Sequence, residues 1–389
     1  MTYRTLRIAL AGCGRISRNH LDAIRAVEGL QLAAVCDTVA DRARSTGEAQ
    51  GVPWFRAIEE MLDAVPCDAV AICTPSGLHP RHGIQVARRG VHVISEKPMA
   101  TRLEEADALV QACDAAGVHL FVVKQNRLNP PIQLVKRAID KGRFGRLYMA
   151  NCTVRWTRPQ EYYDQAPWRG TWEFDGGAFM NQASHYVDLM QWLMGPVESV
   201  TAKTATLARR IESEDSGAAV VRFRNGALGV LEVTMLTYPR NMEGSITVLG
   251  ERGTVKIGGT AVNRIEHWQF ADYDDDDKLA EPLMRATNPA SVYGSGHVGY
   301  YENVRAVLRG EATPDTDGRA GRKSLELILG IYESARTGRE VPVPLRIPGA
   351  VSPEPLFDLP RARAAADRVE APMLPLPVAA DEQRRELTS

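Results

Sequence analysis

Five short apolar runs alternate with amphipathic stretches over the first third of this 389-residue chain. The runs cover residues 6–12, 30–37, 69–75, 91–98 and 118–126. They lack the in–out alternation of a half-exposed strand, as expected when helices cover both faces of a parallel sheet. The stretch 102–116, between the last two runs, is typical of a helix. The pattern predicts an α/β fold that begins with a doubly wound, Rossmann-type parallel sheet.

The pattern changes after about residue 128. Prolines begin a linking helix in NPPIQLVKRAIDKG, and runs with period-two alternation follow, separated by turns such as GERG. These features predict a second, α+β domain with a large, mainly antiparallel, open-faced sheet and two late helices. The expected domains are therefore 1–127 and 128–345, with a peripheral Pro-, Ala- and Arg-rich tail over 346–389.

Charge and composition exclude several classes of partner. The chain has 47 basic and 48 acidic residues, without the basic excess of a nucleic-acid-binding protein. No apolar run approaches the roughly 18 residues that span a bilayer, and the first run leads into a glycine-rich turn, unlike a signal peptide. The six cysteines form no C-x-x-C pair, so we expect reduced cysteines in a cytoplasmic protein and no metal site. The acidic stretch YDDDDK is interpreted as a solvated loop, because adjacent like charges repel.

A glycine-rich turn, AGCGRIS, follows the first run and opens a helix. Gly12 and Gly14 allow a tight turn and let a pyrophosphate approach the helix N-terminus, and Ser17 is small enough for the third fingerprint position. Asp37 ends the second run, at the spacing of the acid that binds the adenine ribose. Because this carboxylate would repel the 2′-phosphate of NADP, we predict NAD as the cofactor, although Arg42 lies nearby.

Three segments resemble the Gfo/Idh/MocA oxidoreductases: the glycine turn, SEKPMA and GGAFMNQASHYVD. The stretch SLELILGIYESARTGREVPV is similar to their closing helix and strand, and the resemblance runs from about residue 5 to 345. The stretches KQNRLNPPIQLVKRAIDKGRFGRLYMANCTVRW and RGTWEFDGGAFMNQASHYVD look especially like bacterial dehydrogenases that oxidise the 3-hydroxyl of UDP-N-acetylglucosaminuronate. The resemblance implies a homo-oligomer, either a dimer or a tetramer, and a role in making sugars for bacterial surface polysaccharide.

Hydride removal from a secondary alcohol needs a base for the hydroxyl proton and a group that stabilises the developing alkoxide. Lys97, at the end of the fourth run, could serve in either role. His185 is expected on a helix that starts near Asn181, with Asn181, His185 and Asp188 on one face. Family members often have Asp where this chain has Asn181, so the imidazole lacks that anionic partner. We favour His185 as the base and Lys97 as its electrostatic partner, and the reverse assignment stays open.

The other candidate residues lie at strand ends and in one arginine-rich loop. The expected cofactor ligands follow the carboxyl ends of the apolar runs: Gly12, Gly14, Arg15, Ile16, Asp37, Thr74, Ser76, His79, Glu96, Gln125 and Asn126. The expected substrate ligands are Lys97, Arg127, Tyr148, Arg155, Arg158, Arg169, Asn181 and His185. Guanidinium groups among aromatic rings suit a diphosphate or carboxylate beside a uracil or sugar, and they equally suit a subunit interface. The resemblance also implies a cis bond before Pro98.

The leading hypothesis is an NAD-dependent dehydrogenase that oxidises the 3-hydroxyl of UDP-N-acetylglucosaminuronate by hydride transfer. A second hypothesis keeps the chemistry but takes a free sugar or polyol such as inositol. A third is a regulatory protein that binds NAD without chemistry. Convergence of Arg155, Arg158 and Arg169 on one cleft near Lys97 would favour the nucleotide sugar, and an outward scatter of these arginines would weaken it.

Overall fold

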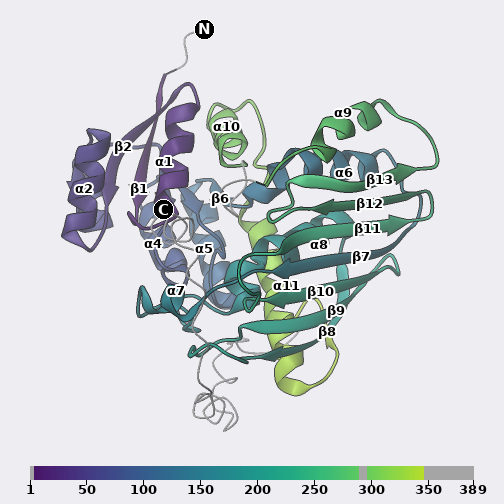
Figure 1. Cartoon of the computed structure of the whole chain (residues 1–389). Helices are drawn as coiled ribbons and strands as arrows, with labels where there is room; N and C mark the ends of the chain where they lie inside the picture. The colour runs from purple at the N-terminus through teal and green to yellow at the C-terminus, as the bar shows by residue number, and fades with distance from the viewer. Residues whose placement is uncertain (1–3, 289–295, 346–389) are drawn as a thin grey trace. The chain divides into compact units, whose positions relative to one another are not determined.

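The computed structural model describes residues 4–288 and 296–345, which form two compact units (Figure 1). Within the described residues, the first unit contains 4–129 and 296–326, and the second contains 130–288 and 327–345. The expected boundary lay two residues earlier and placed 296–326 in the second domain. In the described part of the chain no helix combines the length and the apolar character needed to cross a membrane.

The first unit is built on a six-stranded sheet in the order β3-β2-β1-β4-β5-β6, with every neighbouring pair parallel. Its strands are β1 (Leu6–Ala11), β2 (Leu30–Cys36), β3 (Trp54–Phe55), β4 (Ala69–Ile72), β5 (His92–Ser95) and β6 (Leu120–Val122). Its helices are α1 (Ser17–Ala26), α2 (Ala40–Gln50), α3 (Ile58–Ala64), α4 (His79–Ala87), α5 (Leu103–Ala116) and α10 (His297–Leu308). The predicted doubly wound sheet is confirmed, and each predicted run contains one of its strands.

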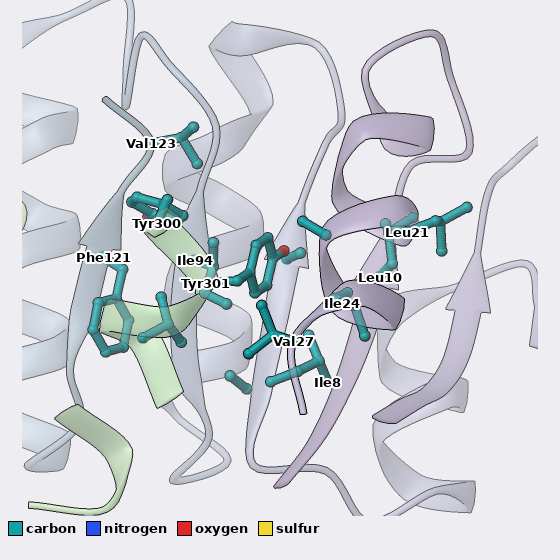
Figure 2. Packing of buried hydrophobic residues seen from close by; sticks show 14 of the residues in the cluster. Ile8, Leu10, Leu21, Ile24, Val27, Ile94, Phe121, Val123, Tyr300 and Tyr301 are labelled. Carbon is teal, nitrogen blue, oxygen red and sulfur yellow. The ribbon is translucent and has the colours of Figure 1, made fainter. Parts of the chain in front are cut away.

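Helices α1 and α10 pack together on one face of this sheet, although 270 residues, 27–296, lie between the end of α1 and the start of α10. Figure 2 shows the buried cluster that they share with the strands. It includes Ile8 and Leu10 from β1, Ile24 from α1, and Tyr300 and Tyr301 from α10. Because α10 contributes two large aromatic side chains to this core, residues 296–326 belong with the first unit.

The second unit contains an eight-stranded sheet in the order β13-β12-β11-β7-β10-β9-β8-β14. The strands are β7 (Leu147–Arg155), β8 (Val197–Ala205), β9 (Ser216–Phe223), β10 (Leu228–Thr234), β11 (Glu243–Gly250), β12 (Gly253–Gly258), β13 (Arg264–Phe270) and β14 (Val341–Pro342). Only the pairing of β7 with β10 is parallel among these described strands, so the predicted mainly antiparallel sheet is confirmed.

Helices cover one face of the second sheet (Figure 1). They are α6 (Pro130–Asp140), α8 (Ser184–Met194) and the part of α11 (Gly318–Thr337) that belongs to this unit, while α7 (Gln160–Asp164) and α9 (Asp275–Met284) lie nearer its margins. On β7 the side chains of Ala150, Cys152 and Val154 are buried, and Cys152 Sγ lies 3.5 Å from the carbonyl oxygen of Tyr186 on α8. The alternate side chains of the strand therefore lie on the uncovered face.

The acidic stretch YDDDDK begins a helix, so the prediction of a loop is wrong. The Asp274 side chain accepts a hydrogen bond from the Asp276 amide, and the Asp277 side chain accepts one from the Asp274 amide. Lys141 Nζ lies 2.8 Å from Asp274 Oδ1 and 3.0 Å from Asp276 Oδ2. Arg143 lies 2.9 Å from Asp277 Oδ1. These cations and the helix N-terminus offset the repulsion between the carboxylates.

Candidate functional site

The glycine turn between β1 and α1 has the shape of a dinucleotide site. Gly12 has a φ of +96°, and a Cβ added there would lie 2.7 Å from the carbonyl carbon of Cys73, so this close approach requires glycine. A Cβ added to Gly14 would meet no atom within 4 Å, so its bare backbone faces open space before the helix. Ser17 Oγ donates to the Gly14 carbonyl oxygen at 2.6 Å. Arg15 and Ile16 complete the turn. These residues fit a pyrophosphate at a helix N-terminus.

Asp37 follows β2 at the same carboxyl edge of the sheet. Its Oδ2 accepts a hydrogen bond from the Cys13 amide at 2.8 Å, and its Oδ1 accepts one from the Val39 amide at 2.8 Å. Each carboxylate oxygen can accept a second bond, so the fixed side chain can still receive two ribose hydroxyls. This arrangement fits the predicted role of Asp37 toward NAD.

His79 braces two strand-end loops. Its Nδ1 lies 2.8 Å from the Pro98 carbonyl oxygen, and its Nε2 lies 2.7 Å from the Thr74 carbonyl oxygen. Burial lowers the pKa of His79, and the two carbonyl contacts only partly oppose that effect. Because both ring nitrogens already face carbonyl oxygens, His79 holds the loop after β4 against the loop after β5. Thr74 and the buried Ser76 lie in the first of these loops.

The segment after β5 carries Lys97 on a strongly constrained backbone. The Lys97–Pro98 bond is cis, which confirms what the resemblance implies. Glu96 is 4% exposed; its Oε2 accepts the Lys97 amide at 2.9 Å, and its Oε1 lies 3.0 Å from His20 Nε2. Burial alone would raise the pKa of Glu96, but the hydrogen bond from His20 and the charges of His20, Lys97 and His297 outweigh it. The pKa of Glu96 therefore lies well below its ordinary range.

Sequence reasoning missed a cluster around Glu96. His20 Nδ1 lies 2.7 Å from Tyr301 Oη, and the rings of His20 and His297 meet edge to face at 5.6 Å between centroids. In the described residues, His20, Glu96 and His297 are the one group of three side chains with a spacing that a metal ion could use. Burial and the charge of His20 lower the pKa of His297 to about 4. No local motif links these residues, because 76 positions separate His20 from Glu96 and 281 separate it from Tyr301.

The predicted ligands after β6 lie in a short 3-10 helix, Gln125–Leu128. Gln125, Asn126 and Arg127 are all buried. A Cβ added to Gly296 would lie 2.0 Å from the carbonyl oxygen of Gln125, so the start of α10 closes directly over this segment. The carboxyl ends of β1, β2, β4, β5 and β6 therefore all carry predicted ligands at one edge of the sheet, where doubly wound folds bind nucleotides.

In the second unit, the segment before His185 is not one continuous helix. Residues Ala178–Gln182 form a π-helical turn, and Ala183, with φ −94° and ψ 3°, separates it from α8. The helix predicted to start near Asn181 therefore starts at Ser184. His185 and Asp188 are both buried on α8, whereas Asn181 Nδ2 donates to the carboxylate of Asp175 in the preceding turn. Asp175 is a carboxylate beside Asn181 that the sequence did not reveal.

A buried acid explains one of the two glycines of this segment, Gly177. A Cβ added to Gly177 would lie 1.6 Å from Glu214 Oε2. The Phe179 amide and the Tyr332 hydroxyl donate to Glu214 Oε1 at 2.8 and 3.0 Å. The close neighbour of Gly177 is therefore the carboxyl group of Glu214. Burial raises the pKa of Glu214 to about 8.

Glu214→Gln is expected to flatten the pH dependence of stability. The pKa of Glu214 is raised on folding, so its contribution is fully present below about pH 4.5 and is lost as the pH rises through about 8. Glutamine keeps an acceptor for Phe179 and Tyr332 and cannot ionise. Between about pH 5 and 9 the wild-type free energy of unfolding should fall by about 4 kcal/mol more than that of the variant, as measured by urea unfolding. The exposed Glu198→Gln should behave like wild type; equal slopes in all three proteins would contradict this account.

Of the three arginines predicted in the arginine-rich loop, Arg155, Arg158 and Arg169, the last two come together. Arg158 Cζ lies 5.5 Å and Arg169 Cζ 4.3 Å from the centre of the Tyr162 ring, and Arg169 also lies 4.8 Å from the Trp168 ring. Arg158 Nε donates to Gln182 Oε1 at 3.0 Å. Gln182 is three residues before His185, so this hydrogen bond connects the arginine-rich loop to the segment that positions the imidazole of His185.

Arg209 joins this group and was missed by sequence reasoning. Its Nε donates to the carbonyl oxygen of Arg158 at 2.6 Å. Its turn is fixed by Asp215, whose carboxylate accepts from the amides of Leu207, Ala208 and Arg209. Within 4–288 and 296–345, Arg158, Arg169 and Arg209 form no ion pair with a carboxylate. We call these three residues the arginine cluster.

Arg155 and Tyr148 lie apart from the arginine cluster. Arg155 is on the uncovered face of the sheet, where its Nε lies 2.7 Å from Glu232 Oε1 and its Nη1 3.1 Å from Glu243 Oε2. Tyr148 is at the opposite end of β7, is 42% exposed and lies under the guanidinium of Arg146. The structure therefore brings only part of the predicted substrate set together. Lys97 and His185 belong to different units, so their shared approach to one ligand stays a prediction.

Two family profiles cover most of the chain. The profile described as "Oxidoreductase family, NAD-binding Rossmann fold" matches residues 6–124, and "Oxidoreductase family, C-terminal alpha/beta domain" matches residues 136–345. The D-apiose dehydrogenase of Paraburkholderia graminis is 30% identical over 87% of this chain and 90% of its own length. The myo-inositol 2-dehydrogenase of Thermotoga maritima is 27% identical over 64% of this chain and 74% of its own length.

Two solved structures are more similar. The WlbA dehydrogenase from Bordetella pertussis, in complex with NADH and UDP-GlcNAcA, is 57% identical with a TM-score of 0.86, over 89% of this chain and 99% of that one. The WlbA dehydrogenase from Chromobacterium violaceum, with the same two ligands, is 53% identical with a TM-score of 0.84, over 89% of this chain and 98% of that one.

Proposed function

Because the chain belongs to the Gfo/Idh/MocA oxidoreductase family, we propose that it is the NAD-dependent dehydrogenase that oxidises the 3-hydroxyl of UDP-N-acetylglucosaminuronate. The observation that carries this proposal is the 57% identity to a dehydrogenase solved with NADH and UDP-GlcNAcA. Family membership makes the chain an oxidoreductase, and the NAD-binding Rossmann match makes NAD its cofactor. A regulatory protein without chemistry is therefore not the interpretation that we favour.

The arginine cluster supports a nucleotide sugar over a free sugar. Arg158, Arg169 and Arg209 supply guanidinium groups that have no carboxylate partner in the described chain, while Tyr162 and Trp168 supply aromatic faces. Planar guanidinium groups bind phosphate and carboxylate oxygens in pairs of hydrogen bonds. A UDP-sugar uronate carries both kinds of anion, and a free polyol carries neither.

The residues of the chain divide the chemistry between them. NAD, when bound, accepts the hydride from the carbinol carbon. The glycine turn and Asp37 hold the cofactor. Lys97 and His185 accept the hydroxyl proton and stabilise the developing negative charge on oxygen. We favour His185 as the base and Lys97 as the cation that stabilises the alkoxide. The products are a 3-keto sugar, NADH and a proton, so atoms and electrons balance.

The test is direct. The purified protein is incubated with NAD and UDP-N-acetylglucosaminuronate, and the NADH absorbance band is followed with an external electron acceptor present to recycle NADH. Turnover with this sugar, and none with UDP-N-acetylglucosamine or free sugars, is expected. A preference for D-apiose or myo-inositol would instead support the free-sugar alternative, which the 30% identity to a D-apiose dehydrogenase favours. No turnover with any of these substrates in folded protein would refute the proposal.

We further infer a cytoplasmic homo-oligomer, a dimer or tetramer, that serves surface-polysaccharide synthesis. The uncovered face of the second sheet supports association, since Val220 and Leu228 expose 51% and 40% of their surface there, beside the ion pairs of Arg155. A single broad sheet face of this kind is typical of an association surface. Sedimentation at micromolar protein concentration measures the oligomeric state, and a monomer would contradict the inferred dimer or tetramer.

Gly14→Ala is expected to weaken NAD binding on the order of tenfold without loss of stability. The added methyl group meets no protein atom within 4 Å, so the apoprotein should fold normally, but it occupies the space that a pyrophosphate needs. Titration of protein fluorescence gives the Kd, and thermal melting gives the stability. Gly12→Ala is the contrasting variant: its Cβ would clash with the backbone of Cys73, so it should lose stability. An unchanged Kd in Gly14→Ala would contradict the cofactor site.

A further inference from the structure

A chain of buried hydrogen bonds runs from α10 through α1 to the backbone of Lys97. Tyr301 Oη lies 2.7 Å from His20 Nδ1, and His20 Nε2 lies 3.0 Å from Glu96 Oε1. Glu96 Oε2 then accepts the Lys97 amide at 2.9 Å. Tyr301 and His20 have no exposed surface, and Glu96 has 4%. All four residues lie in the first unit.

The direction of these bonds follows from the groups that make them. An ionised carboxylate only accepts hydrogen bonds, so His20 Nε2 must carry a proton when it bonds to Glu96. The Tyr301 hydroxyl on the other side of the ring then fixes which ring nitrogen is protonated. A buried carboxylate without partners would be costly, but here each oxygen of Glu96 has a donor. The other titratable side chains near Glu96, besides Lys97, are His79, His297, Tyr300 and Cys73.

We propose that His20 is a positioning residue for the dehydrogenase reaction: through Glu96 it fixes the backbone that carries Lys97. This inference rests on the proposed function only in assigning Lys97 to the reaction. His20 keeps Glu96 ionised and oriented, Glu96 holds the Lys97 amide, and Tyr301 keeps the imidazole in the required tautomer. Glu96 is then an anchor for Lys97, and each of its oxygens accepts a hydrogen bond from the protein. Misplacement of a reacting group by about 1 Å can cost on the order of 10²-fold in rate.

The hydrogen bonds also decide between an ion-pair cluster and a metal site. His20, Glu96 and His297 could surround a cation, because their ligand atoms lie within 4.8 Å of one another. A metal ion needs an unprotonated nitrogen from each histidine. His20 presents its protonated Nε2 to Glu96 and faces Tyr301 with Nδ1, so neither nitrogen points to an open ligand position. We therefore interpret the cluster as a positioning device.

The experiment compares two substitutions at His20. His20→Leu removes the donor to Glu96 and is expected to lower kcat about 10–100-fold, with the KM for NAD changed less than about threefold. His20→Gln places an amide N–H near the position of Nε2 and should restore kcat to within about threefold of wild type. The split between kcat and KM, together with this rescue, is not expected from a residue that only supports folding. Loss of activity in both variants with unchanged melting temperature would overturn the proposal.

Tyr301→Phe and Tyr300→Phe form a matched pair on α10. The first removes the hydroxyl that faces His20 and should lower kcat by about threefold to tenfold. The second removes a buried hydroxyl that has no hydrogen-bond partner in the described residues, so it should leave kcat unchanged. Equal effects of the two substitutions would count against the chain of hydrogen bonds.

A readout that needs no turnover separates this inference from the proposed function. The rate at which an amine-reactive reagent labels Lys97 is measured by peptide mass spectrometry, without NAD or substrate. Without His20, a buried Glu96 should bind a proton, and loss of its charge should make the Lys97 amine label at least threefold faster in His20→Leu but not in His20→Gln. If no sugar is oxidised yet this pattern appears, the proposed function fails and the positioning role stands. Identical labelling in all variants refutes the role. Elemental analysis of the purified protein tests the alternative of a metal site. One equivalent of bound metal that is lost in His297→Phe would show that the cluster is a metal site and would overturn the positioning role.

Discussion

Replacing His185 by Asn is expected to lower kcat by about 10²–10⁴-fold, which is the usual contribution of a general base, while NAD affinity stays within a factor of about three. His185 lies on α8 in the second unit, and NAD is held by the first, so the substitution leaves the cofactor ligands untouched. Asn keeps a hydrogen-bonding side chain but cannot take a proton. Initial rates of NADH formation and a fluorescence titration with NAD measure the two quantities.

The pH profile of this variant decides whether the imidazole is the base. If His185 takes the proton, the acid limb of kcat/KM should disappear in His185→Asn and the residual rate should rise with hydroxide concentration. If the limb persists with its midpoint unchanged, His185 only positions the hydroxyl. His267→Asn is the matched control, because His267 is exposed on β13 of the same unit. A loss of rate in the control equal to that in His185→Asn would undermine the site.

Replacing Lys97 by Met should also lower kcat by about 10²–10⁴-fold, because the site loses the cation that stabilises the alkoxide. Met preserves the length and apolar character of the lysine stem, so the half-buried side chain should still pack. Stopped-flow measurement of the first turnover isolates the chemical step from product release.

Lys97→Arg separates the two possible roles of the lysine. A guanidinium keeps the charge but does not give up a proton near neutral pH. If Lys97 is the electrostatic partner, Arg should recover part of the rate that Met loses. If Lys97 is the base, both variants should be equally slow. A wild-type rate in Lys97→Met would remove Lys97 from the chemistry altogether.

The sequence was sufficient for the parallel sheet because its strands are continuous apolar runs, and these are strong signals. The glycine turn and Asp37 were also predictable, since the fingerprint lies within one strand–turn–helix unit and its acid comes at a fixed distance. Strand β3, Trp54–Phe55, was missed because two residues have no period. The start of α9 was misread because the cations that offset its carboxylates, Lys141 and Arg143, lie more than 130 residues upstream.

The rest of the site depends on contacts between distant segments. Tyr301 reaches His20, and Arg209 reaches Arg158, across separations of 281 and 51 residues. The ion pairs that hold Arg155 on the sheet face come from β10 and β11, so spacing alone could not distinguish it from Arg158. The π-helical turn before Ser184 is likewise bonded to a distant residue, because the Phe179 amide donates to the buried acid Glu214.

The two-part construction of the first unit has a consequence for biosynthesis. The ribosome releases the glycine turn and all six strands of the sheet early, but the hydrophobic core that backs them still lacks Tyr300 and Tyr301. The contact between His20 and the hydroxyl of Tyr301 also cannot form until α10 has left the exit tunnel. The sheet of the nascent chain therefore stays incompletely covered while more than 150 further residues, from 130 to 296, are synthesised. Only then can the core of the nucleotide-binding unit be completed.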